Sequence, residues 1–314
     1  MGGWFVQPHF MSPRLRRQLW IAALLAPALL LLVGFVTLPI LSAFVYAFYQ
    51  WQGLARIGFA GFENFRLILF QEPFSTLTWN AFFHNVVVFV ALMVVQNGTA
   101  FFLAWMLSKG LRLHRFHQVS LFLPVILSTV IIGFLWKLFL NPLFGLVNQG
   151  LIAVGLASWA QPWLGQPSTA LASLILVNAW HWVGFPTLVY LAGIQRIPRE
   201  ILEAAEIDGA SEWRRITRIV WPLVAPATTI VVILTFIGSF NWFELPYIMS
   251  GLEGPPFHTT DVLGLYFYRT AFGTVSSALQ DFGRGSALAV LIFLFILAVS
   301  AWWVRLLRRR EVEF

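Results

Sequence analysis

The chain has 314 residues, of which 59% are hydrophobic and only 11% are charged. Soluble domains carry charge on roughly a quarter of their residues, so this composition excludes an ordinary water-soluble fold. The 15 Trp and 31 Phe residues suit a protein with wide lipid contact and aromatic belts at the bilayer surfaces. Cysteine is absent, which excludes disulfides and thiolate metal sites.

Six apolar stretches are long enough to cross a bilayer, which takes roughly 20 residues each. Each must be helical, because lipid offers no partner to backbone N–H and C=O groups. The first stretch is too long for the core of a signal peptide and is expected to be retained. The sequence therefore predicts an all-α membrane protein that forms a single transmembrane domain over residues 1–314. The predicted spans lie near 19–49, 82–107, 119–140, 169–194, 222–249 and 285–304.

Most of the basic residues fall in four segments that would share one side of the membrane. By the positive-inside rule this side is the cytoplasm, so both termini are predicted to be cytoplasmic. The net charge of +7 reflects topology rather than nucleic-acid binding, because the charges alternate with spans and do not cluster on one domain. The residues concerned are Arg14, Arg16, Arg17, Lys109, Arg112, Arg115, Arg196, Arg199, Arg214, Arg215, Arg218, Arg305, Arg308, Arg309 and Arg310.

Several kinds of catalytic and channel motif are absent from the sequence. Lys109 and Lys137 are the only lysines, and neither follows a phosphate-loop glycine pattern. Neither a His-Glu-x-x-His nor a Gly-x-Ser-x-Gly motif of a protease occurs, and there is no carbonyl filter sequence of a potassium channel. We therefore predict neither catalytic nor metal-binding residues. An ion-gradient-driven secondary transporter is the alternative, although the paired repeats typical of that class are not seen.

The segment 196–222 is a polar loop between two apolar runs and is predicted to contain two short helices. Pro198 suits the first turn of a helix, where its missing N–H is not needed. Gly209 fits a stop signal that requires a left-handed backbone, and Ser211 can cap a second helix. The carboxylates and small alanines of this loop suit close docking to a partner in the cytoplasm.

The spacing within this loop resembles the signature of the permease subunits of ATP-binding-cassette (ABC) importers. It reads Glu203-Ala204-Ala205, three residues, Gly209, nine residues, Ile219, two residues, Pro222. The family usually has Leu before the proline, where this chain has Trp221. Other segments resemble sugar-type permeases, such as those for maltose, other oligosaccharides and glycerol phosphate. These segments are Gly61 to Phe65, Pro124 to Asn148, Ser239 to Glu244, Gly254-Pro255 and Tyr266 to Arg269.

The resemblance implies a type I ABC importer permease fold in the inner membrane of a bacterium or archaeon. It also implies a second permease subunit, two ATPase subunits and an extracytoplasmic solute-binding protein as partners. ATP and Mg²⁺ would then be bound by the ATPase subunits, and this chain would hold no cofactor. In the family the loop docks in a cleft of the ATPase, which assigns that role here to Glu203, Ala204, Ala205, Asp208 and Gly209.

Polar side chains within the predicted spans are candidates for contact with a substrate, because such residues are costly in lipid and usually face a cavity. Sugars need hydrogen-bonding groups for their hydroxyls and flat aromatic faces for their C–H surfaces. The alternative for each residue is a hydrogen bond between helices, and for His181 a packed or gating histidine. The expected pathway residues are Asn178, His181, Asn241, Trp242 and Glu244, and the weaker candidates are Gln96 and Asn97.

Overall fold

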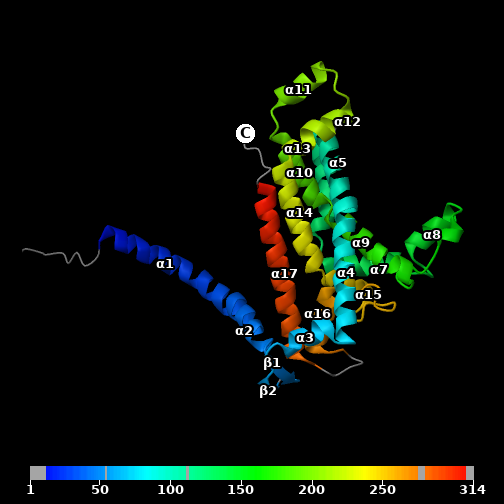
Figure 1. Ribbon diagram of the computed structural model, residues 1–314. Helices are drawn as coiled ribbons and strands as arrows, with labels where there is room; N and C mark the ends of the chain where they lie inside the picture. Colours follow the sequence, from blue (N-terminus) through cyan, green and yellow to red (C-terminus); the bar gives the residue numbers. More distant parts are fainter. Residues whose placement is uncertain (1–11, 54, 111–112, 275–279, 309–314) are drawn as a thin grey trace, which may run out of the picture.

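The computed structural model describes residues 12–53, 55–110, 113–274 and 280–308. The described chain is mostly helical, and most of its long helices lie side by side in a bundle (Figure 1). Arg112, Arg309 and Arg310, which contributed to the predicted orientation, lie outside the described residues.

Within the described residues, three helices are long and apolar enough to cross a membrane. The predicted six are reached only if each of three bent helix pairs is counted as one span. The three long helices are Arg14–Tyr46, which comprises α1 (Pro13–Leu32), η1 (Val33–Thr37) and α2 (Leu38–Tyr46); Phe74–Ser108, which comprises α4 (Phe74–Leu92), η2 (Met93–Asn97) and α5 (Gly98–Ser108); and most of α17 (Phe282–Arg308).

The bent pairs correspond to the predicted third, fourth and fifth spans. Each contains a proline within or next to the bend, where a regular helix loses a hydrogen bond. The pairs are α6 (His114–Phe122) and η3 (Leu123–Ile126) with α7 (Thr129–Phe139), bent by 95°; α9 (Pro167–Trp182) with α10 (Gly184–Gln195), bent by 48°; and α12 (Glu212–Arg215), η5 (Ile216–Val220) and α13 (Trp221–Leu223) with α14 (Ala225–Phe240), bent by 74°.

The expectation of one helix across 222–249 is wrong. α14 ends at Phe240, three residues with irregular backbone follow, and α15 (Glu244–Ser250) begins a new helix. A continuous helix would set the ring of Pro246 against the carbonyl of Trp242, four residues earlier. In the observed structure Pro246 lies in the first turn of α15, where no N–H is needed.

The first helix leaves the bundle. Figure 1 shows α1 running away from the other long helices, which pack together. Its most apolar window has a mean hydropathy of 2.6 and is 0% buried by the rest of the chain. An apolar helix of this length therefore has no protein cover within the described chain, and must be covered by lipid or by another subunit.

The prediction of an all-α fold misses a small antiparallel hairpin. β1 (Tyr49–Gln52) pairs with β2 (Ala55–Phe59), with a bulge between Gln50 and Trp51. The first helix consequently ends at Tyr46 rather than near residue 49. Figure 1 places this hairpin at the opposite end of the bundle from α11 (Arg199–Ile207). The remaining short helices are α3 (Glu63–Phe70), α8 (Leu146–Ala153), η4 (Ala157–Trp159) and α16 (Leu263–Phe272).

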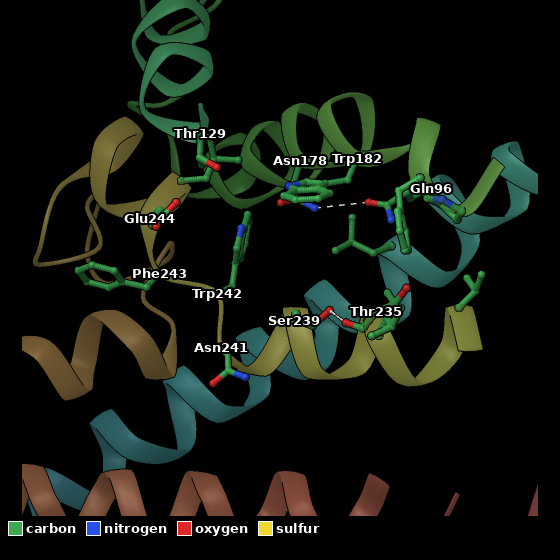
Figure 2. Close-up of a pocket in the computed structure, with 17 residues that line it drawn as sticks. Gln96, Thr129, Asn178, Trp182, Thr235, Ser239, Asn241, Trp242, Phe243 and Glu244 are labelled. Carbon is green, nitrogen blue, oxygen red and sulfur yellow. Dashed lines mark hydrogen bonds between the residues drawn. The ribbon is translucent and has the colours of Figure 1, made fainter. Parts of the chain in front are cut away.

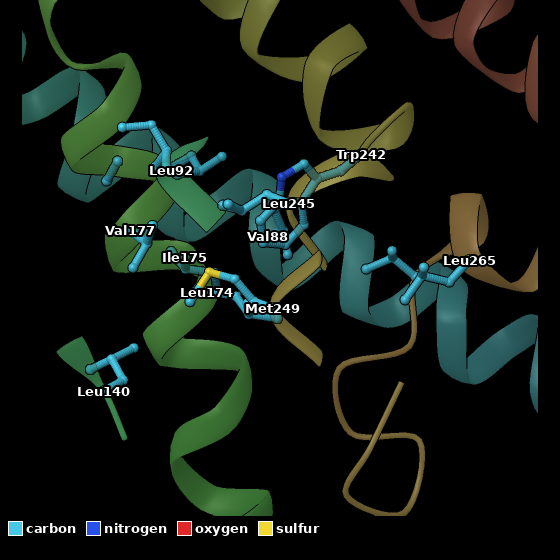
Figure 3. Close-up of a cluster of buried hydrophobic side chains, with 13 residues drawn as sticks. Val88, Leu92, Leu140, Leu174, Ile175, Val177, Trp242, Leu245, Met249 and Leu265 are labelled. Atoms are coloured by element: carbon cyan, nitrogen blue, oxygen red, sulfur yellow. The ribbon is translucent and has the colours of Figure 1, made fainter. Parts of the chain in front are cut away.

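One cluster of buried hydrophobic side chains surrounds the irregular segment between α14 and α15. Trp242 and Leu245 pack there with Val88 from α4 and Leu174 from α9 (Figure 3). This burial fixes the break inside the bundle rather than at its surface.

Asn85 ties three elements together beside the same break. Its side chain is fully buried, and its Nδ2 donates to the carbonyl of Ser239 at 2.6 Å. Its Oδ1 accepts from the backbone N–H of Leu263 at 2.8 Å. One amide thus pairs the end of α14 and the start of α16 with α4, which satisfies backbone groups that lipid would leave unpaired.

A buried ion pair holds the segment that connects α15 to α16. Asp261 is 0% exposed and accepts two hydrogen bonds from the Arg269 guanidinium, one of them 2.7 Å long. Burial raises the pKa of the Asp261 carboxyl, and the hydrogen bonds from Arg269 oppose this rise. The backbone oxygen of Asp261 also lies 2.7 Å from Nδ1 of His84 on α4. The pair therefore fixes this connection against the bundle.

We predict that Arg269→Ala destabilises the protein by about 3–5 kcal/mol, because it leaves a buried carboxylate without its partner. The measurement is the temperature at which the detergent-purified protein is lost from its monodisperse peak. Adding Asp261→Asn to Arg269→Ala should restore part of the stability, since no buried charge then remains. Equal losses in the single and double variants would contradict this account.

Candidate functional site

A cavity of about 610 Å³ lies at the break between α14 and α15 (Figure 2). This volume is within the usual range of small-molecule sites, roughly 300–1,000 Å³. Its wall combines apolar side chains with amides, hydroxyls and indoles. The wall residues come from α4, η2, α7, α9, α10, α14, α15 and the irregular segment 241–243. The polar and aromatic members of the wall are Gln96, Thr129, Asn178, Trp182, Phe185, Thr235, Ser239, Asn241, Trp242, Phe243 and Glu244.

The π-helical segment η2 brings Gln96 to this wall. The Nδ2 of Asn178 donates to Oε1 of Gln96 at 3.4 Å, which links α9 to η2 (Figure 2). The neighbouring Asn97 turns away from the cavity and donates to Oγ1 of Thr235 at 2.9 Å. Such π segments are often found at functional sites. Here the segment gives one amide to the cavity and the other to the contact between helices.

The segment 241–244 presents side chains in different directions. Figure 2 shows Trp242 directed into the cavity and Phe243 extending in another direction from the same segment, with Glu244 near Thr129. Trp242, Phe243 and Glu244 all line the cavity. Trp242 is 8% exposed, and its indole N–H has no hydrogen-bond partner among the described residues. A buried donor without a partner is costly, so this N–H is available to a hydroxyl group in the cavity.

The cavity carries little charge. Within the described part of the chain, Glu244 is the only Asp, Glu, Lys or Arg on its wall. The groups available to a bound molecule are therefore mainly neutral donors and acceptors beside aromatic rings.

Four of the five expected pathway residues lie on the cavity wall, together with the weaker candidate Gln96. They are Asn178, Asn241, Trp242 and Glu244. His181 does not line the cavity: it is 1% exposed, and its Nε2 lies 3.3 Å from the carbonyl of Leu127. This contact joins α9 to the bend before α7, which is the packing alternative considered for His181.

Three hydroxyl-bearing residues of the wall were not predicted: Thr129, Thr235 and Ser239. Thr235 and Ser239 are four residues apart on α14 and so share one face, which is a signal that helical spacing could have provided. The Oγ of Ser239 donates to the carbonyl of Thr235 at 2.7 Å. Thr129 reaches the cavity only because the chain bends by 95° before α7, and no local pattern indicates that direction.

A second candidate site is the loop around α11, at the other end of the chain's long helices. Gly209 has φ +73°, and its N–H donates to the carbonyl of Glu206 at 3.0 Å. The N–H of Ala210 donates to the carbonyl of Ala205 at 2.9 Å. This pair of bonds is a Schellman motif, so the predicted glycine stop of the helix is confirmed. Ser211 caps α12 through the N–H of Arg214 at 3.4 Å, also as predicted.

One face of α11 is exposed. Glu203 and Ala204 are exposed on it, and Ile207 is 86% exposed. Ala205 faces the other way and is buried. The helix therefore presents an isoleucine, a small alanine and a carboxylate that are accessible to a partner.

Four charged side chains brace this loop against the end of α5. Arg215 donates to Glu206 at 3.1 Å and to Glu212 at 2.8 Å. Lys109, which follows α5, donates to the same Glu212 oxygen at 2.6 Å. Such partly exposed pairs contribute little stability individually, but together they join α11, α12 and α5. The orientation of α11 is therefore tied to the long helices.

Among the described residues, no group of three or more His, Asp or Glu side chains could hold a metal ion. The polar groups of the cavity are mainly amides, hydroxyls and indoles, with one carboxylate, and this set suits an organic ligand better than a cation.

Comparison with known proteins places this chain in a family. Residues 96–312 match the family described as binding-protein-dependent transport system inner membrane component. The chain is 30% identical over 295 residues to the probable starch degradation products transport system permease protein AmyD of Thermoanaerobacterium thermosulfurigenes, covering 94% of this chain and 96% of the relative. It is 31% identical over 276 residues to the lactose transport system permease protein LacF of Rhizobium radiobacter, covering 88% and 89%.

The fold is similar to a chain in the crystal structure of a bacterial ABC transporter involved in the import of the acidic polysaccharide alginate. The TM-score is 0.78 at 25% identity, covering 94% of this chain and 97% of the other. The two chains thus share their overall fold over most of their length. On the family match and these relatives, the chain belongs to the inner membrane components of binding-protein-dependent transport systems.

Proposed function

We propose that this chain is a permease subunit of an ATP-driven ABC importer for a sugar or oligosaccharide. With a second permease it forms the translocation pathway, and an extracytoplasmic binding protein delivers the substrate. The observation that carries the substrate class is the cavity at the break between α14 and α15, with its amides, hydroxyls and indoles. The relatives AmyD and LacF are named for carbohydrates, as is the alginate transporter, which supports the same class.

The chemistry of the cavity wall matches what a sugar requires. Asn178, Asn241 and Gln96 offer both donors and acceptors to hydroxyl groups. Trp182 and Trp242 offer flat rings to the C–H faces of a pyranose, and the free indole N–H of Trp242 offers one further donor.

Energy is supplied by partner chains in this proposal. The chain contains no phosphate-loop motif, so ATP and Mg²⁺ are bound by two ATPase subunits and the chain itself is not catalytic. The exposed face of α11 is where an ATPase docks, and the coupling segment comprises Glu203, Ala204, Ala205, Asp208 and Gly209. Of these Ala205 is buried on the other face of the helix, so its role is to seat the segment rather than to contact the ATPase. The Schellman motif and the ion pairs of Arg215 restrain this segment, so that a movement of the docked ATPase is passed on to the transmembrane helices.

The orientation follows from the basic residues. Lys109 pairs with Glu212 beside α11, and Figure 1 shows the C-terminal end of α17, which carries Arg305, at the same end of the bundle. We assign this end to the cytoplasm by the positive-inside rule. The hairpin of β1 and β2 then faces the outside, the termini are cytoplasmic, and the membrane is the inner membrane of a bacterium or archaeon.

The uncovered first helix supports the need for a second permease. Its apolar surface is not buried by this chain, and a homologous subunit beside it would cover part of it. Purification of the tagged chain from its native membrane tests the assembly. Co-purification of an ATPase and a sister permease is expected, whereas uptake by the chain alone, driven by an ion gradient, would favour a secondary transporter.

We predict that Glu203→Lys lowers ATPase co-purification or uptake by about tenfold, the usual effect of losing a central interface contact. The side chain is exposed, so the substitution should leave the fold intact. Both quantities are measured in membranes that contain the complete importer. Glu63→Lys, at the far end of the bundle, is the control and should change neither. Normal association and normal uptake in Glu203→Lys would contradict the docking role.

We predict that Asn241→Ala and Trp242→Ala each reduce uptake by about tenfold, because each removes a hydrogen-bonding or stacking partner of the sugar. Assembly with the partner subunits should be preserved, as measured by co-purification. Trp159→Ala is the control, since Trp159 is exposed and lies outside the cavity wall. Unchanged uptake in both cavity variants would remove this cluster from the pathway.

A further inference from the structure

Four aromatic residues form a continuous, largely exposed surface beside the cavity at the break between α14 and α15, which we call the central cavity. Phe243 stacks on Tyr247 with ring centroids 5.4 Å apart, and on Tyr268 at 5.2 Å. Tyr268 contacts Phe272 at 5.0 Å. The pair Phe243 and Tyr247, at the start of α15, thus contacts the pair Tyr268 and Phe272 on α16 through the rings of Phe243 and Tyr268. The residues of each pair are four positions apart. We call these four residues the aromatic surface.

The aromatic surface is not part of the hydrophobic core. Tyr247 is 44% exposed, Tyr268 is 38% exposed and Phe272 is 47% exposed. Large aromatic residues gathered on one exposed patch commonly mark a binding site. The two tyrosines also add hydroxyl groups at its edge, which a surface that faces only lipid does not need.

A second cavity, of about 680 Å³, opens on this surface. Its wall includes Phe243 and Tyr247 together with Lys137 and Glu244. Flat rings beside charged and polar groups are the combination that sugars use, with C–H faces on the rings and hydroxyls on the polar groups. The Nζ of Lys137 donates to the carbonyl of Ile248 at 3.4 Å, which holds this ammonium group beside the cavity.

The two cavities adjoin at two shared wall residues. Phe243 and Glu244 line both of them. Figure 2 shows Phe243 and Trp242 extending in different directions from the segment between α14 and α15. A sugar unit on Phe243 therefore lies beside Glu244, which also lines the central cavity.

We propose that the aromatic surface is a second sugar-binding subsite, which holds the trailing units of an oligosaccharide while its leading units occupy the central cavity. This inference rests on the proposed function and narrows the substrate to sugars of several units. Tyr247, Tyr268 and Phe272 do not line the central cavity, so a sugar short enough to be held there alone does not need them. The contribution of the aromatic surface thus depends on the length of the sugar.

The test uses the complete importer with its binding protein in proteoliposomes and measures ATP-dependent uptake. The probes are tritium-labelled α-1,4-glucan, β-1,4-glucan and arabinan oligosaccharides, each from the disaccharide to the hexasaccharide. In Tyr247→Ala and Tyr268→Ala, uptake of the longest imported sugar should fall about three- to tenfold, the effect of one lost aromatic contact. Uptake of the disaccharide should stay within about twofold of wild type.

Matched variants separate binding from folding. Tyr247→Phe and Tyr268→Phe keep the rings and should retain most uptake of long sugars. Phe70→Ala removes an exposed aromatic at the same end of the bundle, outside both cavities, and should have no effect. Co-purification with the partner subunits should be normal in every variant.

The outcomes separate this proposal from the function on which it rests. Disaccharide uptake in the alanine variants shows that the importer itself works. Equal loss at every length, or loss of a partner subunit, would overturn the subsite and assign the aromatic surface to assembly. Unchanged uptake of the long sugars would also overturn it. No uptake of any probe by the wild-type importer would overturn the proposed function together with the subsite.

Discussion

The break between α14 and α15 depends on one constraint, that a backbone polar group at membrane depth must find a partner within the protein or in a water-filled cavity. Three residues, 241–243, leave the helical pattern there. The carbonyl of Trp242 lies so close to Gly264 that a Cβ at that position would be 2.6 Å from it. The segment is thus packed against protein on one side and opens to the central cavity on the other, and the rest of the architecture keeps it so.

Buried polar side chains supply much of that support. Asn85 pairs with the backbone at the end of α14 and at the start of α16, and the pair of Asp261 and Arg269 fixes the connection from α15 to α16. Each would be costly if left unpaired. Because they are paired, they hold irregular backbone in one arrangement. The cavity wall is therefore pre-formed around Trp242 rather than assembled from mobile loops.

Local patterns in the sequence were enough to predict the apolar stretches, the end of α11 and the start of α12. The Gly209 stop and the Ser211 cap are visible in the sequence because they depend only on neighbouring residues. The bends and the break depend on contacts between distant segments. A proline such as Pro246 indicates that a helix is interrupted, but it does not show in which directions Trp242 and Phe243 extend. The same limit explains His181 and Asn97, whose polar groups contact helices rather than the cavity.

The two candidate sites lie along one stretch of chain. The segment from α12 through η5, α13 and α14 runs from the loop that holds α11 to the cavity residues Thr235 and Ser239, with one bend of 74° before Ala225. Ion pairs link the first turn of this segment to its neighbours: Glu212 pairs with Lys109 at the end of α5, and Arg215 pairs with Glu206 of α11. From α12 onward this stretch contains no long irregular loop, because α12, η5 and α13 are helical and Val224 leads directly into α14. In the coupling proposed above, a partner that moved α11 would therefore act on the wall of the central cavity through this stretch, without contacting the cavity itself.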